Sequence, residues 1–148
     1  MTSPAGQELV ITRTFDAPRA LVYRAFTDPD QLAAWFGPAG FSVPRETVEI
    51  DARPGGVERF TMVSDTDPAM ASPVNARFTE VIENELLVGV EAGPGPAASM
   101  TLRIEFHEEP GDRTRLVIRQ GPFPGEIADM AREGWLSSFP KLDKLLAA

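Results

Sequence analysis

Hydrophobic and polar residues alternate one by one near the start of the chain and then change to helical spacing. The alternation from Leu9 to Phe15 predicts a β-strand. Apolar residues three and four apart from Pro18 to Thr27 predict a short helix, with proline at its first position, where a missing N–H does no harm. A second short helix is predicted to follow Asp28 as N-cap, with Gln31 reaching back as in a capping box, and to end before Gly37.

The middle of the chain, from Val43 to Gln120, consists of short alternating segments separated by Gly, Pro, Asn and Asp. This pattern is typical of an antiparallel sheet with one face in water. Six strands are predicted here: Thr47–Ala52, Val57–Ser64, Val74–Ile82, Leu86–Glu91, Ser99–His107 and Thr114–Gln120. On the fifth of them the alternation is so regular that one face is expected to be core and the other solvent, which places His107 outside.

After Gly125 the apolar residues return to helical spacing, which predicts a long C-terminal helix lying on the sheet. Its apolar face is predicted to hold Ile127, Ala131, Gly134, Trp135, Ser138, Leu142 and Leu145. Pro140 is expected to kink this helix near Leu136, because it removes one backbone hydrogen bond.

The order of elements predicts an α+β fold in which a seven-stranded antiparallel sheet curves around the long C-terminal helix, with two short helices after the first strand. Such a sheet is wider than a single helix of about 10 Å diameter. A gap is therefore expected between the sheet and the helices, either filled by large side chains or open to a ligand.

Composition limits the functions that this fold can serve. The 148 residues, 43% hydrophobic and 24% charged, suit one domain over residues 1–148, with a flexible N-terminus over residues 1–7. A formal net charge of -8 without a basic cluster argues against nucleic acid and anionic membranes as partners. With no cysteine and one histidine, no metal or other cofactor is expected. Because no signal peptide or apolar membrane span is visible, a cytoplasmic protein is the expectation.

Motifs spread over most of the chain resemble one protein family. They are Arg13–Pro18, Val22–Pro29, Trp35–Pro38, Ile50–Gly56, Phe60–Met62, Phe78–Val81, Leu86–Val88, Glu133–Trp135 and Lys141–Leu145. In this order they resemble the helix-grip proteins related to the activator of heat-shock protein 90 ATPase. The resemblance implies a fold of the START-like, SRPBCC or birch-pollen-allergen-like superfamily, whose members enclose a cavity between the sheet and the long helix. Functions there range from lipid and hormone carriage to polyketide cyclisation and chaperone activation, so the fold selects none of them.

Two positions depart from the usual pattern of that family. Glu58 stands where relatives commonly carry an aromatic residue, and Pro140 lies inside the last helix. If Glu58 shares a face with Phe60 and Met62, as strict alternation predicts, an acid points towards the cavity. A bulge at the preceding glycine turn would reverse that direction. The family has no shared catalytic constellation to transfer, so no catalytic residue is assigned.

The candidate ligand-binding residues are mostly aromatic. They are Trp35, Phe36, Phe41, Glu58, Phe60, Met62, Phe78, Phe106, Trp135 and Ser138. Such side chains either line a pocket for a flat apolar molecule or simply form the core, and the two tryptophans are favoured as ligand contacts because a buried indole N–H needs a partner. Ser138 either hydrogen-bonds to a ligand or donates back to the carbonyl of Gly134. Glu58 either has a raised pKa and serves as an acid or base, or faces water at a strand end.

Three functions are compatible with these features. The first is a non-enzymatic module that binds a small hydrophobic or aromatic molecule in the cavity. The second is a co-chaperone of the stress response that stimulates a heat-shock ATPase, which the chain length weakens because 148 residues hold only the helix-grip domain. The third is a cyclase or hydrolase for a hydrophobic substrate, which requires Glu58 and Ser138 to point inward. A homodimer would protect the edge strands, but no sequence feature specifies one, and no motif identifies the ligand.

Overall fold

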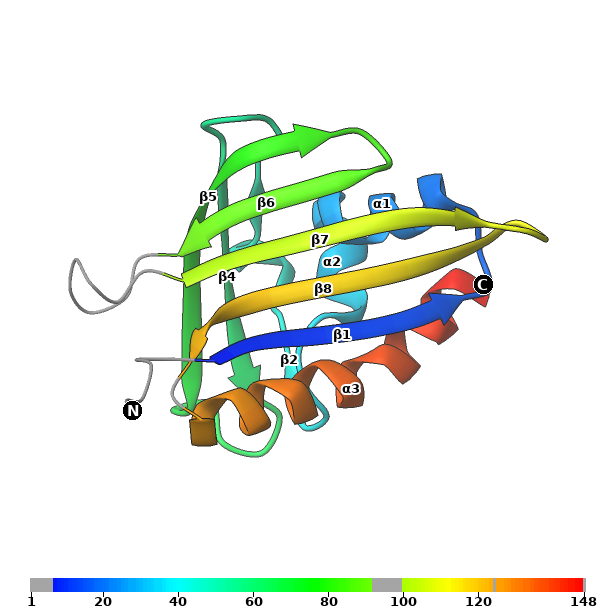
Figure 1. The fold of residues 1–148 in the computed structure, drawn as a ribbon. Coiled ribbons are helices and arrows are strands. Elements are labelled where there is room, and N and C mark those ends of the chain that lie inside the picture. Colours follow the sequence, from blue (N-terminus) through cyan, green and yellow to red (C-terminus); the bar gives the residue numbers. More distant parts are fainter. Residues whose placement is uncertain (1–6, 92–99, 124, 148) are drawn as a thin grey trace.

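The structure is a computed structural model that describes residues 7–91, 100–123 and 125–147 (Figure 1). The flexible N-terminus expected over residues 1–7 lies outside this part of the chain, except for Gln7, which begins the first strand.

Eight strands of the described residues form one antiparallel sheet. They are β1 (Gln7–Phe15), β2 (Phe41–Ser42), β3 (Glu49–Ile50), β4 (Val57–Ser64), β5 (Ala71–Ile82), β6 (Leu86–Glu91), β7 (Met100–Glu109) and β8 (Arg113–Phe123). Their spatial order is β1-β8-β7-β6-β5-β4-β2, and β3 also pairs with β4. The predicted α+β fold and curved sheet are confirmed. The sequence does not predict β2, because two residues are too few to show an alternation.

The second predicted strand is shorter than its sequence suggests. Arg45–Thr47 form a single 3-10 turn, η1, and only Glu49–Ile50 of the predicted segment, which are β3, pair with β4. The hydroxyl of Thr47 closes the turn by donating to the carbonyl of Pro44 at 2.7 Å. This turn leads the chain from β2 to β3, both of which pair with β4. The alternation there therefore does not correspond to one long strand.

Two short helices, α1 (Arg19–Thr27) and α2 (Pro29–Trp35), follow β1 as predicted. Asp28 is the N-cap of α2: its carboxylate accepts hydrogen bonds from two N–H groups of the first turn, at 2.9 and 3.2 Å. The predicted capping box is wrong. The N–H of Asp28 already donates to the carbonyl of Arg24 at 2.8 Å, so Gln31 has no free donor to accept from.

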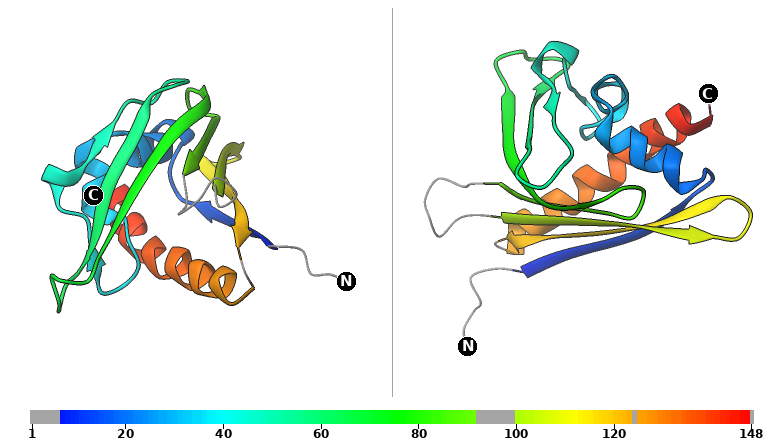
Figure 2. Two further views of the ribbon diagram at one scale, coloured as in Figure 1. Left: turned by 90° about the vertical axis from the view of Figure 1, so that its left-hand side faces the viewer. Right: turned by 90° about the horizontal axis from the view of Figure 1, so that it is seen from above.

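The long helix α3 (Gly125–Ala147) lies across the concave side of the sheet and continues through Pro140 (Figures 1 and 2). Its buried face includes Trp135, Ser138 and Leu142, as predicted. It is rotated from the predicted centre, because Ile127 is 44% exposed whereas Phe139 is only 2% exposed. At 100° per residue these two side chains lie about 120° apart around the helix. The ring of Phe139 packs edge-on against Phe15 of β1 at 5.3 Å, which turns this side of the helix to the sheet.

The C-terminal half of α3 is anchored to β1 by a bidentate ion pair. Arg13 donates two hydrogen bonds to the carboxylate of Asp143, at 3.0 and 2.7 Å. Its guanidinium also lies 4.6 Å from the centre of the Phe15 ring and 5.4 Å from that of Phe139. The pair is partly exposed, so its main effect is to fix where the helix lies and not to add much stability.

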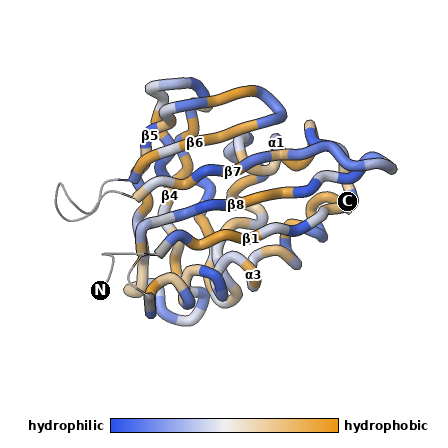
Figure 3. Tube along the Cα trace, in the orientation of Figure 1, coloured by the Kyte–Doolittle hydropathy of each residue, from blue (hydrophilic) through white to orange (hydrophobic). Residues whose placement is uncertain are grey.

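The core lies between the concave face of the sheet and the helices. Figure 3 shows that the central parts of β1 and β8 are hydrophobic. Trp35 is 1% exposed, and its indole N–H donates to the carbonyl of Ala25 at 2.9 Å. Phe106 packs edge-on against Tyr23 at 5.4 Å and against Phe26 at 5.6 Å. The contacts of Trp35 and Phe106 are therefore made within the protein, as expected for core residues.

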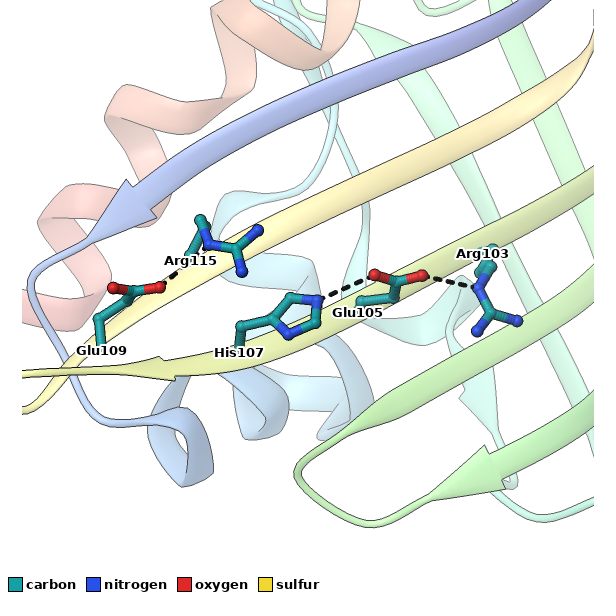
Figure 4. A network of polar contacts seen from close by, with 5 residues as sticks. All are labelled: Arg103, Glu105, His107, Glu109 and Arg115. Atoms are coloured by element: carbon teal, nitrogen blue, oxygen red, sulfur yellow. Dashed lines mark hydrogen bonds and ion pairs between the residues drawn. The ribbon is translucent and has the colours of Figure 1, made fainter.

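The outer face of β7 and β8 is polar, and His107 lies there as the alternation predicts (Figure 4). Its Nε2 is 2.9 Å from Oε1 of Glu105, and Oε2 of the same carboxylate accepts a hydrogen bond from Arg103 at 2.8 Å. These hydrogen bonds, that of Arg103 first, lower the pKa of Glu105. Next to them Arg115 donates to Glu109 at 3.0 Å. The charges pair with one another along this face.

Candidate ligand-binding pocket

A partly open pocket of about 500 Å³ lies between the concave face of the sheet and the helices. Its wall comes from Phe26 of α1, from α2 and the turn after it, from the inward residues of β4 to β8, and from α3 as far as Ser138. Pockets of about 300 to 1,000 Å³ are the size in which proteins hold small molecules. The gap predicted from the width of the sheet is thus left unfilled by side chains in this region.

Seven of the ten candidate residues line this pocket. They are Phe36, Glu58, Phe60, Met62, Phe78, Trp135 and Ser138. The ring of Phe36 is central, because it packs edge-on against Phe60 at 5.0 Å and against Trp135 at 5.5 Å. The wall is therefore braced by contacts between α2, β4 and α3.

The other three candidates, Trp35, Phe41 and Phe106, do not line the pocket. Trp35 and Phe106 belong to the core between the sheet and α1, as described above. Phe41 lies on β2, at the edge of the sheet, where its carbonyl accepts a hydrogen bond from Lys141 at 3.1 Å. The sequence predicts that aromatic residues such as these belong to the core. It does not show which part of the core leaves space for a ligand.

Sequence reasoning missed the part of the wall that comes from β6, β7, β8 and the first turns of α3. The residues concerned include Glu91, Met100, Leu102, Ile104, Gln120, Phe123, Ile127 and Met130. The alternation of β7 does place Met100, Leu102 and Ile104 on the core face. No signal in the sequence shows that α3 leaves this stretch uncovered. Ile127 and Met130 are 44% and 68% exposed, although both line the pocket.

Glu58 points into the pocket together with Phe60 and Met62. The pairing of β4 with β5 is continuous from Val57 to Val63, so no bulge changes the alternation along this stretch. The reversed direction that a bulge would have caused is therefore excluded for Glu58.

A second carboxyl group lies close to the first. Glu58 pairs with Ala76 on β5, and Ala76 in turn pairs with Glu91 on β6, so the three residues form one row across three strands. Burial, with the nearby charge of Glu91 as a smaller cause, raises the pKa of Glu58 to about 7. Burial also raises the pKa of Glu91. Among the described residues of the wall, these two are the only charged ones.

Two neutral polar side chains of the wall, Trp135 and Ser138, donate their hydrogen bonds within the protein. The indole N–H of Trp135 donates to the side-chain carbonyl of Gln120 at 2.9 Å. The hydroxyl of Ser138 donates to the carbonyl of Trp135 at 2.6 Å, so the expected backward hydrogen bond forms, but to Trp135 and not to Gly134. The two glutamates, in contrast, are the charged groups that the described wall offers to a bound molecule.

No helix in the described part of the chain is long and apolar enough to cross a membrane. Within the same residues, no three His, Asp or Glu side chains come together as they would around a metal ion.

The comparison with known families agrees with the geometry. The family described as "Activator of Hsp90 ATPase homolog 1-like protein" matches residues 16–147. The chain belongs to this family. The match covers both short helices, strands β2 to β8 and the long helix, so all elements that build the pocket lie within it. No curated protein matches the chain.

Solved structures similar to this member of the Hsp90 ATPase activator homolog family share its fold along nearly their whole length. A protein from Chromobacterium violaceum is 26% identical, with a TM-score of 0.83, and the match covers 95% of this chain and 97% of that one. A protein from Nitrosomonas europaea is 25% identical, with a TM-score of 0.80 over 98% and 97% of the two chains. The AHSA1 protein from Silicibacter pomeroyi, at 23% identity, a TM-score of 0.78 and coverage of 95% and 98%, supports the fold alone.

Proposed function

We propose that this protein is a binding module that holds a small, mostly apolar molecule in the pocket between the sheet and α3. The observation that carries the proposal is the pocket itself: about 500 Å³ of space whose wall is apolar apart from a few polar groups. Burying an apolar ligand there would release water from aromatic and aliphatic side chains, which is the main favourable term in such binding. A homodimer and a cytoplasmic location remain expectations from the sequence.

The construction of the wall also supports binding. The aromatic contacts of Phe36 and the hydrogen bonds of Trp135 and Ser138 fix the pocket before any ligand enters. A site that is already formed loses little conformational entropy when it binds. The wall therefore needs no rearrangement to accept a flat apolar molecule.

Filling the pocket from α3 is expected to abolish binding. Ala131 lies on the wall, and Ala131→Trp would place an indole in the space that a ligand needs. We expect the wild-type protein to bind the uncharged fluorescent probe N-phenyl-1-naphthylamine and the variant to bind it at least about tenfold more weakly, a loss of about 1.4 kcal/mol or more. The measurement is a fluorescence titration.

Leu136→Trp is the matched control, because Leu136 lies five residues along α3, about 140° around the helix from Ala131, and is 46% exposed. Its affinity for the probe is expected to stay within about twofold of the wild type. The proposal fails if the wild-type protein does not bind the probe, or if Ala131→Trp binds it as well as Leu136→Trp does.

A second candidate function, proton transfer on the bound molecule, is favoured by Glu58. A carboxyl group with a pKa of about 7 inside an apolar pocket suits a general acid or base. Conversion of a molecule retained by the purified protein, followed by mass spectrometry, is then expected to fall about 100-fold or more in Glu58→Gln. Equal conversion by both proteins would rule this function out.

Hsp90 ATPase activation, which the family description names, is a separate hypothesis. It is tested by measuring the ATPase rate of the purified chaperone with and without this protein.

A further inference from the structure

The charges of the pocket are all of one sign. Glu58 and Glu91 are the only charged residues among the described residues of the wall, and neither forms an ion pair with a basic side chain of the described chain. A carboxylate that is removed from water without a partner is unfavourable, and a second one nearby makes it more so. The two carboxylates in this apolar wall therefore have no positively charged partner.

The positions of the two carboxyl groups suit a shared partner. Ala76 lies between them in the same row of the sheet, so no large side chain separates them on the concave face. Across two strand spacings, their Cα atoms are about 10 Å apart. Glutamate side chains are long enough to reach towards a small group between them. The curvature of the sheet at this point turns the two side chains towards the same space, since both line the pocket.

We infer that the molecule bound in this pocket carries a protonated amino group, which lies between the carboxylates of Glu58 and Glu91 while its apolar body fills the rest of the pocket. This inference rests on the proposed function and names the class of ligand: an apolar molecule with one compact cation. An ammonium group has three donors and a full positive charge, so it can satisfy both carboxylates at once. The formal net charge of -8 would also draw cations towards the protein.

Two other ligand chemistries fit the wall less well. A carboxylate or phosphate would be repelled by both glutamates. A neutral hydroxyl could hydrogen-bond to one of them but would leave the second without a counter-charge. Trp135 and Ser138 already use their donors on Gln120 and on the backbone. The described wall holds no basic side chain that could compensate the charge of an anion.

The inference can be tested with three probes that share one aromatic body: 1-naphthylmethylamine, 1-naphthylmethanol and 1-naphthoic acid. Calorimetric titration of the wild-type protein at pH 8 is expected to show the amine binding at least about tenfold more tightly than the alcohol, with the acid weakest. In Glu58→Gln the amine is expected to lose about tenfold in affinity, whereas the alcohol changes by less than about twofold. Glu91→Gln should act in the same direction.

Glu80→Gln is the matched control, because it removes the same charge from an exposed position of β5 outside the pocket. It is expected to leave the preference for the amine unchanged. A second readout is pH: amine affinity should fall about tenfold from pH 8 to pH 6, as Glu58 takes up a proton. Glu91 is the one other titratable group on the described wall and protonates in the same direction.

The outcomes separate this inference from the proposed function. If the wild-type protein binds the alcohol or the acid as tightly as the amine, the pocket binds ligands but the inference is wrong. If the amine preference is the same in Glu58→Gln and Glu91→Gln as in the wild type, the carboxylates are not its cause and the inference is again wrong. If none of the three probes binds but N-phenyl-1-naphthylamine does, the inference is wrong and the proposed function stands; if N-phenyl-1-naphthylamine does not bind either, both fail. The comparison of probes on the wild-type protein needs no variant to fold.

Discussion

Gly56→Ala is expected to destabilise the fold by about 3 kcal/mol or more, because the added methyl group has no room in the turn before β4. A Cβ at position 56 would overlap the backbone carbonyl oxygen of Asp51 and lie 3.0 Å from that of Arg53. Neither oxygen can move aside at small cost, because the N–H of Arg53 donates to Asp51 and the N–H of Gly56 donates to Arg53, both at 2.8 Å. The measurement is the free energy of unfolding in urea.

The matched control is Gly134→Ala on α3. There the added Cβ meets only the Cβ of Pro38, at an ordinary 3.8 Å, so the site does not require glycine. Alanine in the interior of a helix is favoured over glycine, and this variant is expected to gain about 0.5 to 1 kcal/mol. Equal stabilities for Gly56→Ala and the wild type would show that the turn before β4 is not as tight as described. That turn matters for the pocket, because it sets the start of the strand that carries Glu58.

The long strands and the long helix can be predicted from periodicity, because their patterns of apolar residues extend over many positions. The alternation over β7 and the helical spacing over α3 each extend over many residues, so their type is predicted correctly. Short elements are different. The two residues of β2 are too few to show a period, and the alternation over Thr47–Ala52 predicts a strand of which only Glu49–Ile50 form one. Both short strands form because they pair with β4. That pairing depends on the tertiary structure and is not a local property of the sequence.

The pocket is predicted in part, for a related reason. Alternation correctly puts Glu58 on the core face of β4, because a side chain on a regular strand has only two directions. It cannot show that Glu91 lies one strand beyond, since that depends on the register of β5 with both neighbours. Likewise, Trp35 and Trp135 are alike in sequence terms, yet only Trp135 reaches the pocket. Which core positions remain open depends on how α3 is placed, and a packing contact between Phe15 and Phe139 sets its rotation.

Glu58→Gln is expected to stabilise the protein by about 2 to 3 kcal/mol at pH 8 and to have no effect near pH 4. The pKa of Glu58 is about 7 in the folded protein, against 4.5 for an ordinary glutamate. Below pH 4.5 the carboxyl is protonated in both the folded and the unfolded chain, so the neutral amide is equivalent to it. Between pH 4.5 and 7 the unfolded chain loses the proton while the folded protein keeps it, so the wild type becomes less stable. Above pH 7 both are ionised, and the difference is constant.

Urea unfolding of both proteins from pH 4 to pH 8.5 measures this difference, and Glu80→Gln, which changes an exposed acid, should give a flat line. A gap between wild type and Glu58→Gln that does not change with pH would contradict the burial of the carboxyl in the pocket. Repeating the series with saturating 1-naphthylmethylamine adds a sharper test, because a cation between Glu58 and Glu91 would stabilise the ionised form that the empty pocket disfavours. The wild type should then gain stability with pH relative to the variant. Ionised Glu58 would thus lower the stability of the ligand-free protein but raise the stability of the complex. A role for Glu58 in binding a cation requires this reversal.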